Sequence, residues 1–208
     1  FNLNRNGFIQ AVSYKESSAD LKLSPNHKIN IIASAKKSAG GHRGFFQMGE
    51  SALFETGYYL GDLGVDFRKL NPEKERGKIN TIRSTFGKND WKGGSGKNGI
   101  YSLNDFLTKP ELQLMAVNDW INHLCKRMRI LDFNQYYGQI INGVEVTESG
   151  AIAGAHLMGE GGLATFLGSP QFQQKSAVSD ANGTHISSYI SMFGGFDLEN
   201  CCKRKIYI

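Results

Sequence analysis

The sequence predicts a mainly α-helical protein that carries a small β-hairpin or flap insertion. Several segments place apolar residues at steps of three and four, which is the period of an amphipathic helix. A strand signal is confined to "INGVEV" at 141–146. No internal repeat and no proline-rich linker divides the 208 residues, so we expect one domain over 1–208.

The first predicted helix covers "GFIQAVSYKE" at 7–16. Glu16 lies on neighbouring rows of one helical face with three apolar residues, Phe8, Ile9 and Val12. Loss of hydration beside apolar side chains raises the pKa of a carboxyl group, which keeps a general acid protonated near neutrality. Glu16 is therefore a candidate general acid, and the alternative is a glutamate that ends an exposed turn.

Two long polar stretches flank the next predicted helix. The first, at 20–42, is rich in lysine and ends in glycines, and we expect a hairpin or flap there. A helix is then predicted from about Gly49 to Tyr59. The second stretch, at 61–104, is rich in glycine, lysine and asparagine and is interpreted as a functional loop or cleft wall.

The clearest helix pattern runs from Pro110 to Met128, with proline in the first turn. Its apolar residues recur at steps of three and four, and they are Leu114, Val117, Ile121, Leu124 and Met128. We expect this segment to be the central core helix.

Two further helices are predicted in the last third of the chain. Thr147 is a candidate N-cap for a helix whose small residues, Ala151 to Met158, allow another backbone to approach closely. Thr184 is a candidate cap for the second helix, and Gly194-Gly195 is a stop signal.

The composition favours a soluble protein with a polyanionic partner. Lys and Arg number 24 against 19 Asp and Glu, a net charge of +5, which suits nucleic acid or an anionic cell wall. The basic pairs, Lys36-Lys37, Lys126-Arg127 and Lys203-Arg204-Lys205, are scattered without an aromatic and basic stripe. No apolar run reaches the length of a membrane span. We therefore expect neither nucleic acid nor a membrane as partner.

Metal and nucleophile chemistry find little support in the sequence. The 5 His show no i,i+4 pairing, and the 3 Cys fit neither a zinc site nor a disulfide framework, so we expect no metal, no cofactor and no dependence on disulfides. Neither a nucleophile elbow nor a phosphate-binding fingerprint is present. Hydrolysis by carboxylates is the remaining chemical option.

Three pieces occur in order: "ESS" at the end of a helix, "GFFQ" in a glycine-rich turn and "AGAHLMG" in a later helix. They resemble the motifs of lysozyme-like muramidases and soluble lytic transglycosylases. Longer strings, including "GFFQMGESAL", "NDWKGGSGKNG" and "DANGTHISSYISMFGGF", are similar to lysozyme-like domains of phage tail lysins and of type VI secretion effectors and spike proteins. The resemblance covers nearly the whole chain and implies a lysozyme-like fold.

The resemblance also implies roles for residues. Glu16 would be the general acid, Gln47 would line the cleft, and His156 stands where the family often has tyrosine. Gln47 holding a turn and His156 lying in the core are the structural alternatives.

Glycoside hydrolysis ordinarily needs a second carboxylate, for which Asp20 and Glu50 are candidates. Glu50 is equally interpretable as a residue that stabilises a helix N-terminus. Trp91, expected to be exposed, and Tyr137 are candidates for stacking on sugar rings.

The implied function is cleavage of peptidoglycan between N-acetylmuramic acid and N-acetylglucosamine by an antibacterial effector or lysin. The alternatives are a lytic transglycosylase that leaves anhydro products and a non-catalytic wall-binding module. The resemblance implies peptidoglycan, a cognate immunity protein and a secretion-apparatus component as partners, and action in the periplasm or cell wall of a target bacterium. The chain lacks a signal peptide pattern, and we expect it to be the C-terminal part of a larger protein.

Overall fold

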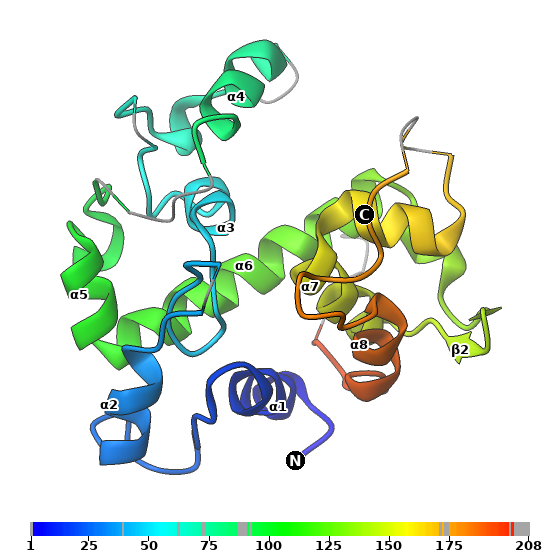
Figure 1. Cartoon of the computed structure of the whole chain (residues 1–208), viewed down its shortest axis with the longest axis horizontal. Helices are drawn as coiled ribbons and strands as arrows, with labels where there is room; N and C mark the ends of the chain where they lie inside the picture. The colour runs from blue at the N-terminus through cyan, green and yellow to red at the C-terminus, as the bar shows by residue number, and fades with distance from the viewer. Residues whose placement is uncertain are drawn as a thin grey trace, which may run out of the picture. The chain divides into compact units, whose positions relative to one another are not determined.

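The computed structural model describes residues 2–38, 40–61, 63–71, 74–86, 91, 93–170, 172, 175–199 and 201 (Figure 1). The α-helices in these residues are α1 Arg5–Ser17, α2 Lys28–Ser34, α3 Glu50–Glu55, α4 Arg76–Arg83, α5 Leu103–Thr108, α6 Pro110–Ile130, α7 Glu148–Leu167 and α8 Ile186–Met192. Short 3-10 turns are η1 Phe67–Lys69, η2 Lys97–Gly99 and η3 Phe133–Tyr136. Strands β1 Ile140–Ile141 and β2 Val144–Glu145 pair antiparallel. The predicted mainly α class with a small hairpin is confirmed.

The chain divides into two compact units. Unit 1 contains Phe1–Val12 and Ile121–Ile208, and unit 2 contains Ser13–Trp120. The boundaries fall inside α1 and α6, so each of these helices contributes residues to both units. The expectation that 1–208 acts as one catalytic domain stays a prediction.

The core of unit 2 is largely aromatic. Phe54 packs edge-on against Phe67 and Phe86, with ring centroids 5.2 Å and 5.3 Å away. Tyr58 and Tyr59, which follow α3 in the chain, are fully buried. The ring of Tyr59 lies 5.9 Å from that of Phe86. Buried aromatic rings contribute large apolar areas and favour such edge-to-face contacts. Trp91, one of the predicted site residues, packs against Tyr59 in this core.

Two predicted loops of unit 2 contain helices instead. Stretch 61–104 includes α4, whose Ile79 and Ile82 are buried at an i,i+3 spacing amid charged residues. Stretch 20–42 includes α2, which begins where the His27 imidazole accepts a hydrogen bond from the Ile29 backbone N–H. A hairpin over 20–42 is therefore wrong. Charged and polar residues in these segments obscured their short helical periods.

Helix α3 is shorter than predicted, ending at Glu55 rather than near Tyr59. The Thr56 hydroxyl donates to the Ala52 carbonyl at 2.7 Å, and Gly57 has a φ of +78°. A left-handed glycine after the last turn is a common helix stop.

The predicted core helix over 110–128 is confirmed as α6. Four of its five expected core residues are buried, and Leu114 is partly buried. The buried four are Val117, Ile121, Leu124 and Met128. The regular apolar period of this helix made it readable from sequence.

In unit 1, α7 and α8 pack closely against each other (Figure 1). The Thr147 hydroxyl accepts a hydrogen bond from the Gly150 N–H, which confirms the predicted cap. A Cβ at Gly150 would lie only 2.5 Å from the Ile190 carbonyl oxygen, so glycine is what allows α8 to approach. The cap of α8 is His185 rather than the predicted Thr184, because its imidazole accepts from the Ser187 N–H.

Unit 1 also contains a disulfide that the sequence did not indicate. Cys125 of α6 is bonded to Cys201, 76 residues further along the chain. The expectation that disulfides play no part is wrong, because spacing along the sequence carries no information about so distant a partner. Closing a loop of this length restricts the unfolded chain and stabilises the folded unit.

Candidate functional site at the end of helix α1

Helix α1 ends immediately after Glu16. The Ser17 hydroxyl donates to the Ser13 carbonyl at 2.9 Å, and the Ser18 N–H donates to the Tyr14 carbonyl at 2.8 Å. Ser18 has a φ of +64°, the left-handed conformation that terminates helices. Glu16 itself is half-buried, whereas the apolar residues that precede it on its face, Phe8, Ile9 and Val12, are buried. The predicted amphipathic helix is thus confirmed.

The "GFFQ" segment forms a tight turn. The Arg43 and Met48 backbones exchange two hydrogen bonds, of 3.0 Å and 2.9 Å, across it. Gly44 has a φ of +77°, and a Cβ there would lie 2.2 Å from the Gln113 side-chain oxygen. Only glycine fits this position, since both the backbone conformation and the approach of Gln113 exclude a side chain. Phe45 and Phe46 are fully buried and anchor the turn in the core of unit 2.

Gln113 of α6 ties three segments of unit 2 together and is almost completely buried. Its Oε1 accepts a hydrogen bond from the Phe45 N–H at 2.8 Å. Its Nε2 donates to the Ser34 and Phe106 carbonyls, both at 2.8 Å. Buried backbone groups need such partners. The "GFFQ" turn is therefore fixed to the ends of α2 and α5 by one side chain.

Lys36 connects the end of α1 to the same turn. Its ammonium donates to the Glu16 carbonyl oxygen at 2.7 Å. Its own carbonyl accepts a hydrogen bond from the Gln47 Nε2 at 3.3 Å. Two motifs that are distant in the sequence, "ESS" and "GFFQ", thus share one residue as a neighbour within unit 2.

Gln47 stabilises its own turn. It is 8% exposed, has a φ of +45°, and its Nε2 also donates to the Gly44 carbonyl at 2.8 Å. Both amide hydrogens of Gln47 therefore bind backbone carbonyls, and its Oε1 has no donor within the part of the chain that the structure describes. An unpaired buried acceptor is energetically costly. The alternative in which Gln47 holds the turn therefore accounts for the hydrogen bonds of its Nε2. It gives no role to its Oε1.

Asp20 lies in the turn after α1 and is partly buried. Its Oδ1 accepts a hydrogen bond from the Lys22 N–H at 3.1 Å, closing a local Asx turn. The Asn30 side chain binds both the N–H and the carbonyl of Asp20, each at 2.9 Å. Asp20 is thereby held in place by α2.

Glu50, the first residue of α3, is only 4% exposed. Its Oε1 accepts a hydrogen bond from the Trp91 N–H at 3.1 Å. A carboxylate in the first turn of a helix is also favoured by the helix dipole. Glu50 therefore has a structural role, which was one of its two sequence interpretations.

The expectation of an exposed Trp91 is wrong, because the residue is 6% exposed. Its ring lies 5.1 Å from the ring of Phe106 and 5.9 Å from that of Tyr59. Glycine-rich surroundings suggested a surface loop, whereas the indole packs with other aromatic rings in the core of unit 2. A buried indole offers no platform for a sugar.

The two remaining predicted site residues belong to unit 1. His156 of α7 and Tyr137, which follows η3, are both partly buried. Three residues beyond His156, Gly159 interrupts α7 with φ +69° and ψ 176°. Arg127 of α6 binds both carboxylate oxygens of Glu160, at 2.6 Å and 2.8 Å, next to this interruption. Of the predicted site residues, Glu16, Asp20, Gln47, Glu50 and Trp91 belong to unit 2, whereas His156 and Tyr137 belong to unit 1.

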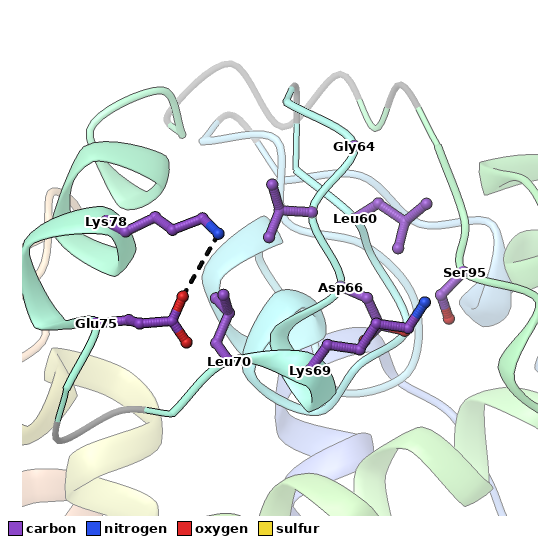
Figure 2. Close-up of a pocket in the computed structure, with 9 residues that line it drawn as sticks. Leu60, Gly64, Asp66, Lys69, Leu70, Glu75, Lys78 and Ser95 are labelled. Atoms are coloured by element: carbon purple, nitrogen blue, oxygen red, sulfur yellow. Dashed lines mark hydrogen bonds and ion pairs between the residues drawn. The ribbon is translucent and has the colours of Figure 1, made fainter.

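A pocket of about 420 Å³ lies elsewhere in unit 2, between the loop after α3 and helix α4 (Figure 2). Figure 2 shows Glu75 and Lys78 of its lining joined by an ion pair, 3.5 Å long. Arg68 holds the pKa of Asp66 below its ordinary value by hydrogen bonding. The Asn71 N–H, with Lys78, likewise lowers the pKa of Glu75. The predicted site residues are not among those that line this pocket.

Sequence reasoning missed Lys36 and Gln113. Lys36 appeared only as half of a basic pair, and Gln113 as a polar residue in an apolar helix pattern. The one available signal for Gln113 was its position on the buried side of α6, between core residues. A polar residue there usually has buried partners.

Three kinds of comparison bear on the identity of the site. A search for similarity to family models, to curated proteins and to solved structures finds no significant match.

Across the described residues no cluster of three or more His, Cys, Asp or Glu has the geometry to hold a metal ion. In that same part of the chain, none of the helices has the length and apolar character to cross a membrane.

Proposed function

We propose that this protein cleaves the glycan strands of peptidoglycan as an N-acetylmuramidase, with Glu16 as the general acid. The observation that carries the proposal is the position of Lys36, which contacts both the Glu16 carbonyl and the Gln47 amide. Two of the three motifs that resemble those of lysozyme-like muramidases, "ESS" and "GFFQ", are therefore neighbours within unit 2, and the third, "AGAHLMG", belongs to unit 1. A binding residue and an acid must lie near each other to act on one bond.

In this proposal Glu16 donates its proton to the glycosidic oxygen as the bond to the anomeric carbon of N-acetylmuramic acid breaks. Water then adds to that carbon, which gives a reducing end and returns a proton. The half-buried position of Glu16 supports this role, because a general acid must be shielded yet reachable by substrate. The net charge of +5 supports association with an anionic wall.

A lytic transglycosylase is the second candidate, and the state of the other carboxylates favours it. Asp20 and Glu50 each use a carboxylate oxygen to bind a backbone N–H. Glu50 is in addition nearly inaccessible to solvent. If neither can serve as base or nucleophile, the substrate's own hydroxyl attacks the anomeric carbon and an anhydro sugar is formed.

The test is a comparison of the intact chain with Glu16→Gln on purified peptidoglycan. We expect the intact chain to lower the turbidity of the suspension and Glu16→Gln to leave it unchanged, because the amide keeps the shape but cannot donate the proton. A Lys126→Gln variant, changed on the exposed surface of α6, serves as the control and should behave as the intact chain.

Sedimentation of the same mixtures separates the enzyme from a wall-binding module. A chain that pellets with peptidoglycan without clearing it would be such a module, and the muramidase proposal would fail. Full clearing by Glu16→Gln would remove Glu16 from the mechanism.

A further inference from the structure

Helix α2 presents its three isoleucines outward, while two of its polar residues, Asn30 and Ser34, are buried. Its three isoleucines are exposed, Ile29 by 45%, Ile31 by 51% and Ile32 by 63%. Its buried residues are Asn30, Ala33 and Ser34. An amphipathic helix on a protein surface normally has the reverse arrangement. Burial in the core of the protein therefore does not account for the presence of these three isoleucines.

The orientation of α2 is fixed by hydrogen bonds of its buried polar residues. The Asn30 amide donates to the carbonyls of Asp20 and Ser24, at 2.9 Å and 3.0 Å. The Ser34 hydroxyl donates at 3.0 Å to the carbonyl of Leu107, a residue of helix α5, which contacts α2. Rotating α2 to bury its isoleucines would break these bonds. The exposed isoleucines are thus a stable feature of unit 2.

The chain segment that carries these isoleucines is rich in lysine. Residues 21–38 contain four lysines and no Asp or Glu. Lys22, Lys28 and Lys37 have no ion-pair partner among the described residues. Apolar side chains on a short helix, flanked by lysines, are the combination that binds the interface of anionic lipid membranes.

We propose that α2 is a peripheral docking site for an anionic lipid membrane. We call this the α2 surface, and it consists of Ile29, Ile31, Ile32, Lys22, Lys28 and Lys37. The isoleucines enter the boundary between headgroups and acyl chains, and the lysines bind anionic headgroups. The composition favours lipid over a protein partner, because protein interfaces are enriched in aromatic residues and arginine and depleted in lysine. Residues 21–38 contain neither aromatic rings of Phe, Tyr or Trp nor arginine.

This proposal departs from the sequence expectation that a membrane is no partner. That expectation concerned spanning segments, and α2, about 10 Å long, lies on the surface rather than crossing it. The proposal does not depend on glycan cleavage, since it concerns residues outside the predicted catalytic set.

The experiment is co-sedimentation of the intact chain with vesicles of phosphatidylcholine alone and with added phosphatidylglycerol. We expect binding only to the anionic vesicles, weakened by salt because charge attraction is screened. Ile29→Ser with Ile32→Ser keeps every charge and should weaken binding by about tenfold or more, since two apolar side chains no longer insert. Lys22→Gln with Lys28→Gln should weaken it by about tenfold at low salt.

Two matched variants test whether any exposed isoleucine, or any pair of lysines, would contribute to vesicle binding in the same way. Ile140→Ser alters an isoleucine of β1 that is 75% exposed, and Lys69→Gln with Lys74→Gln removes two lysines outside the α2 surface. Both should bind vesicles as the intact chain does. Thermal unfolding should be unchanged in all variants, because every altered side chain is exposed.

Three results would overturn the proposal. The first is no binding of the intact chain to anionic vesicles. The second is equal loss of binding in the control variants, which would indicate net charge alone. The third is a concentration-dependent dimer that disappears in Ile29→Ser with Ile32→Ser while vesicle binding is absent, which would assign the α2 surface to a second copy of the chain.

Discussion

The end of α1 and the start of α3 each carry a glutamate in unit 2, and their surroundings differ. Glu50 is 4% exposed, and its carboxylate accepts a hydrogen bond from the Trp91 backbone. Glu16 is half-buried, and its backbone carbonyl accepts a hydrogen bond from the Lys36 ammonium. The Glu50 side chain is therefore held in the core by a hydrogen bond, whereas the bond from Lys36 holds the backbone of Glu16. The proposed general acid is thus the less buried of the two glutamates.

The same contrast explains why we propose different roles for two carboxylates that lie in or next to the "ESS" and "GFFQ" motifs. A buried carboxylate needs a partner to compensate for lost hydration, and this partner fixes its geometry. A general acid must keep access to substrate. Variants at the end of α1, at the start of α3 and at the residues that hold them would separate structural effects from the proposed catalytic ones.

The largest expected effect is at Gln113, which fixes the turn that precedes α3 to α2 and α5. Gln113→Leu removes three hydrogen bonds and leaves the Phe45 N–H and the Ser34 and Phe106 carbonyls without this partner. Each such loss costs about 1 kcal/mol, so the free energy of unfolding should fall by about 3 kcal/mol. Urea denaturation measures it, with Asn118→Leu, which loses a bond within its own helix, as the control. Equal stabilities of the two variants would contradict the anchoring role.

A smaller loss of stability is expected at Glu50. Glu50→Ala leaves the Trp91 N–H unpaired in the core and should lower the free energy of unfolding by about 2 kcal/mol. Glu16→Ala should lower it by less than about 0.5 kcal/mol. The two variants are compared by urea denaturation under one set of conditions. If Glu16→Ala proved the more destabilising, the assignment of roles would have to be exchanged.

Lys36 should affect cleavage more than stability. Lys36→Met loses the bond to the Glu16 carbonyl and should lower kcat about tenfold, equivalent to about 1.4 kcal/mol in the barrier. KM should change little, because the residue positions the acid rather than binding sugar. Lys36→Arg, which can still donate to that carbonyl, should recover most of the rate. A rate unchanged in Lys36→Met would show that the bond does not position Glu16.

The smallest effect is expected away from both helix ends, at the Asp66–Arg68 pair. Arg68 lowers the pKa of Asp66, so the folded chain binds this proton more weakly than the unfolded chain. The pair therefore stabilises above about pH 4, and that stabilisation is lost as the pH falls toward the lowered pKa. Asp66→Asn should cost about 0.5 kcal/mol at pH 7, since the pair is partly exposed.

Denaturation at pH 7 and at about pH 2 measures the contribution of Asp66. The difference in stability between the intact chain and Asp66→Asn should be visible at pH 7 and absent at the acidic pH. A difference that persists in acid would mean that the pair acts through packing rather than charge.

The sequence predicted those parts of the fold in which the apolar period agrees with burial. Helix α6 is such a case, since Val117, Ile121 and Leu124 recur regularly and are buried. Helix α2 was missed because its isoleucines face outward and its buried contacts are polar. The Cys125–Cys201 bond and the contacts of Gln113 join residues far apart in the chain, and no local pattern encodes them.

For the site, the resemblance of motifs predicted Glu16 and Gln47. Each of these residues is hydrogen-bonded to Lys36, which supports the proposal that they belong to one site. The exposure of Trp91 was predicted wrongly, because glycine-rich composition does not reveal that Tyr59 and Phe106 enclose the indole. The roles of His156 and Tyr137 stay predictions.

The most direct test of the central claim is mass spectrometry of the soluble fragments released from peptidoglycan by the intact chain and by Glu16→Gln. We predict disaccharide-peptides that end in reducing N-acetylmuramic acid with the intact chain and none with the variant. Anhydro ends would retain Glu16 as the acid and assign the reaction to a lytic transglycosylase. Undiminished fragments from Glu16→Gln, or no cleaved sugar from the intact chain, would contradict the account.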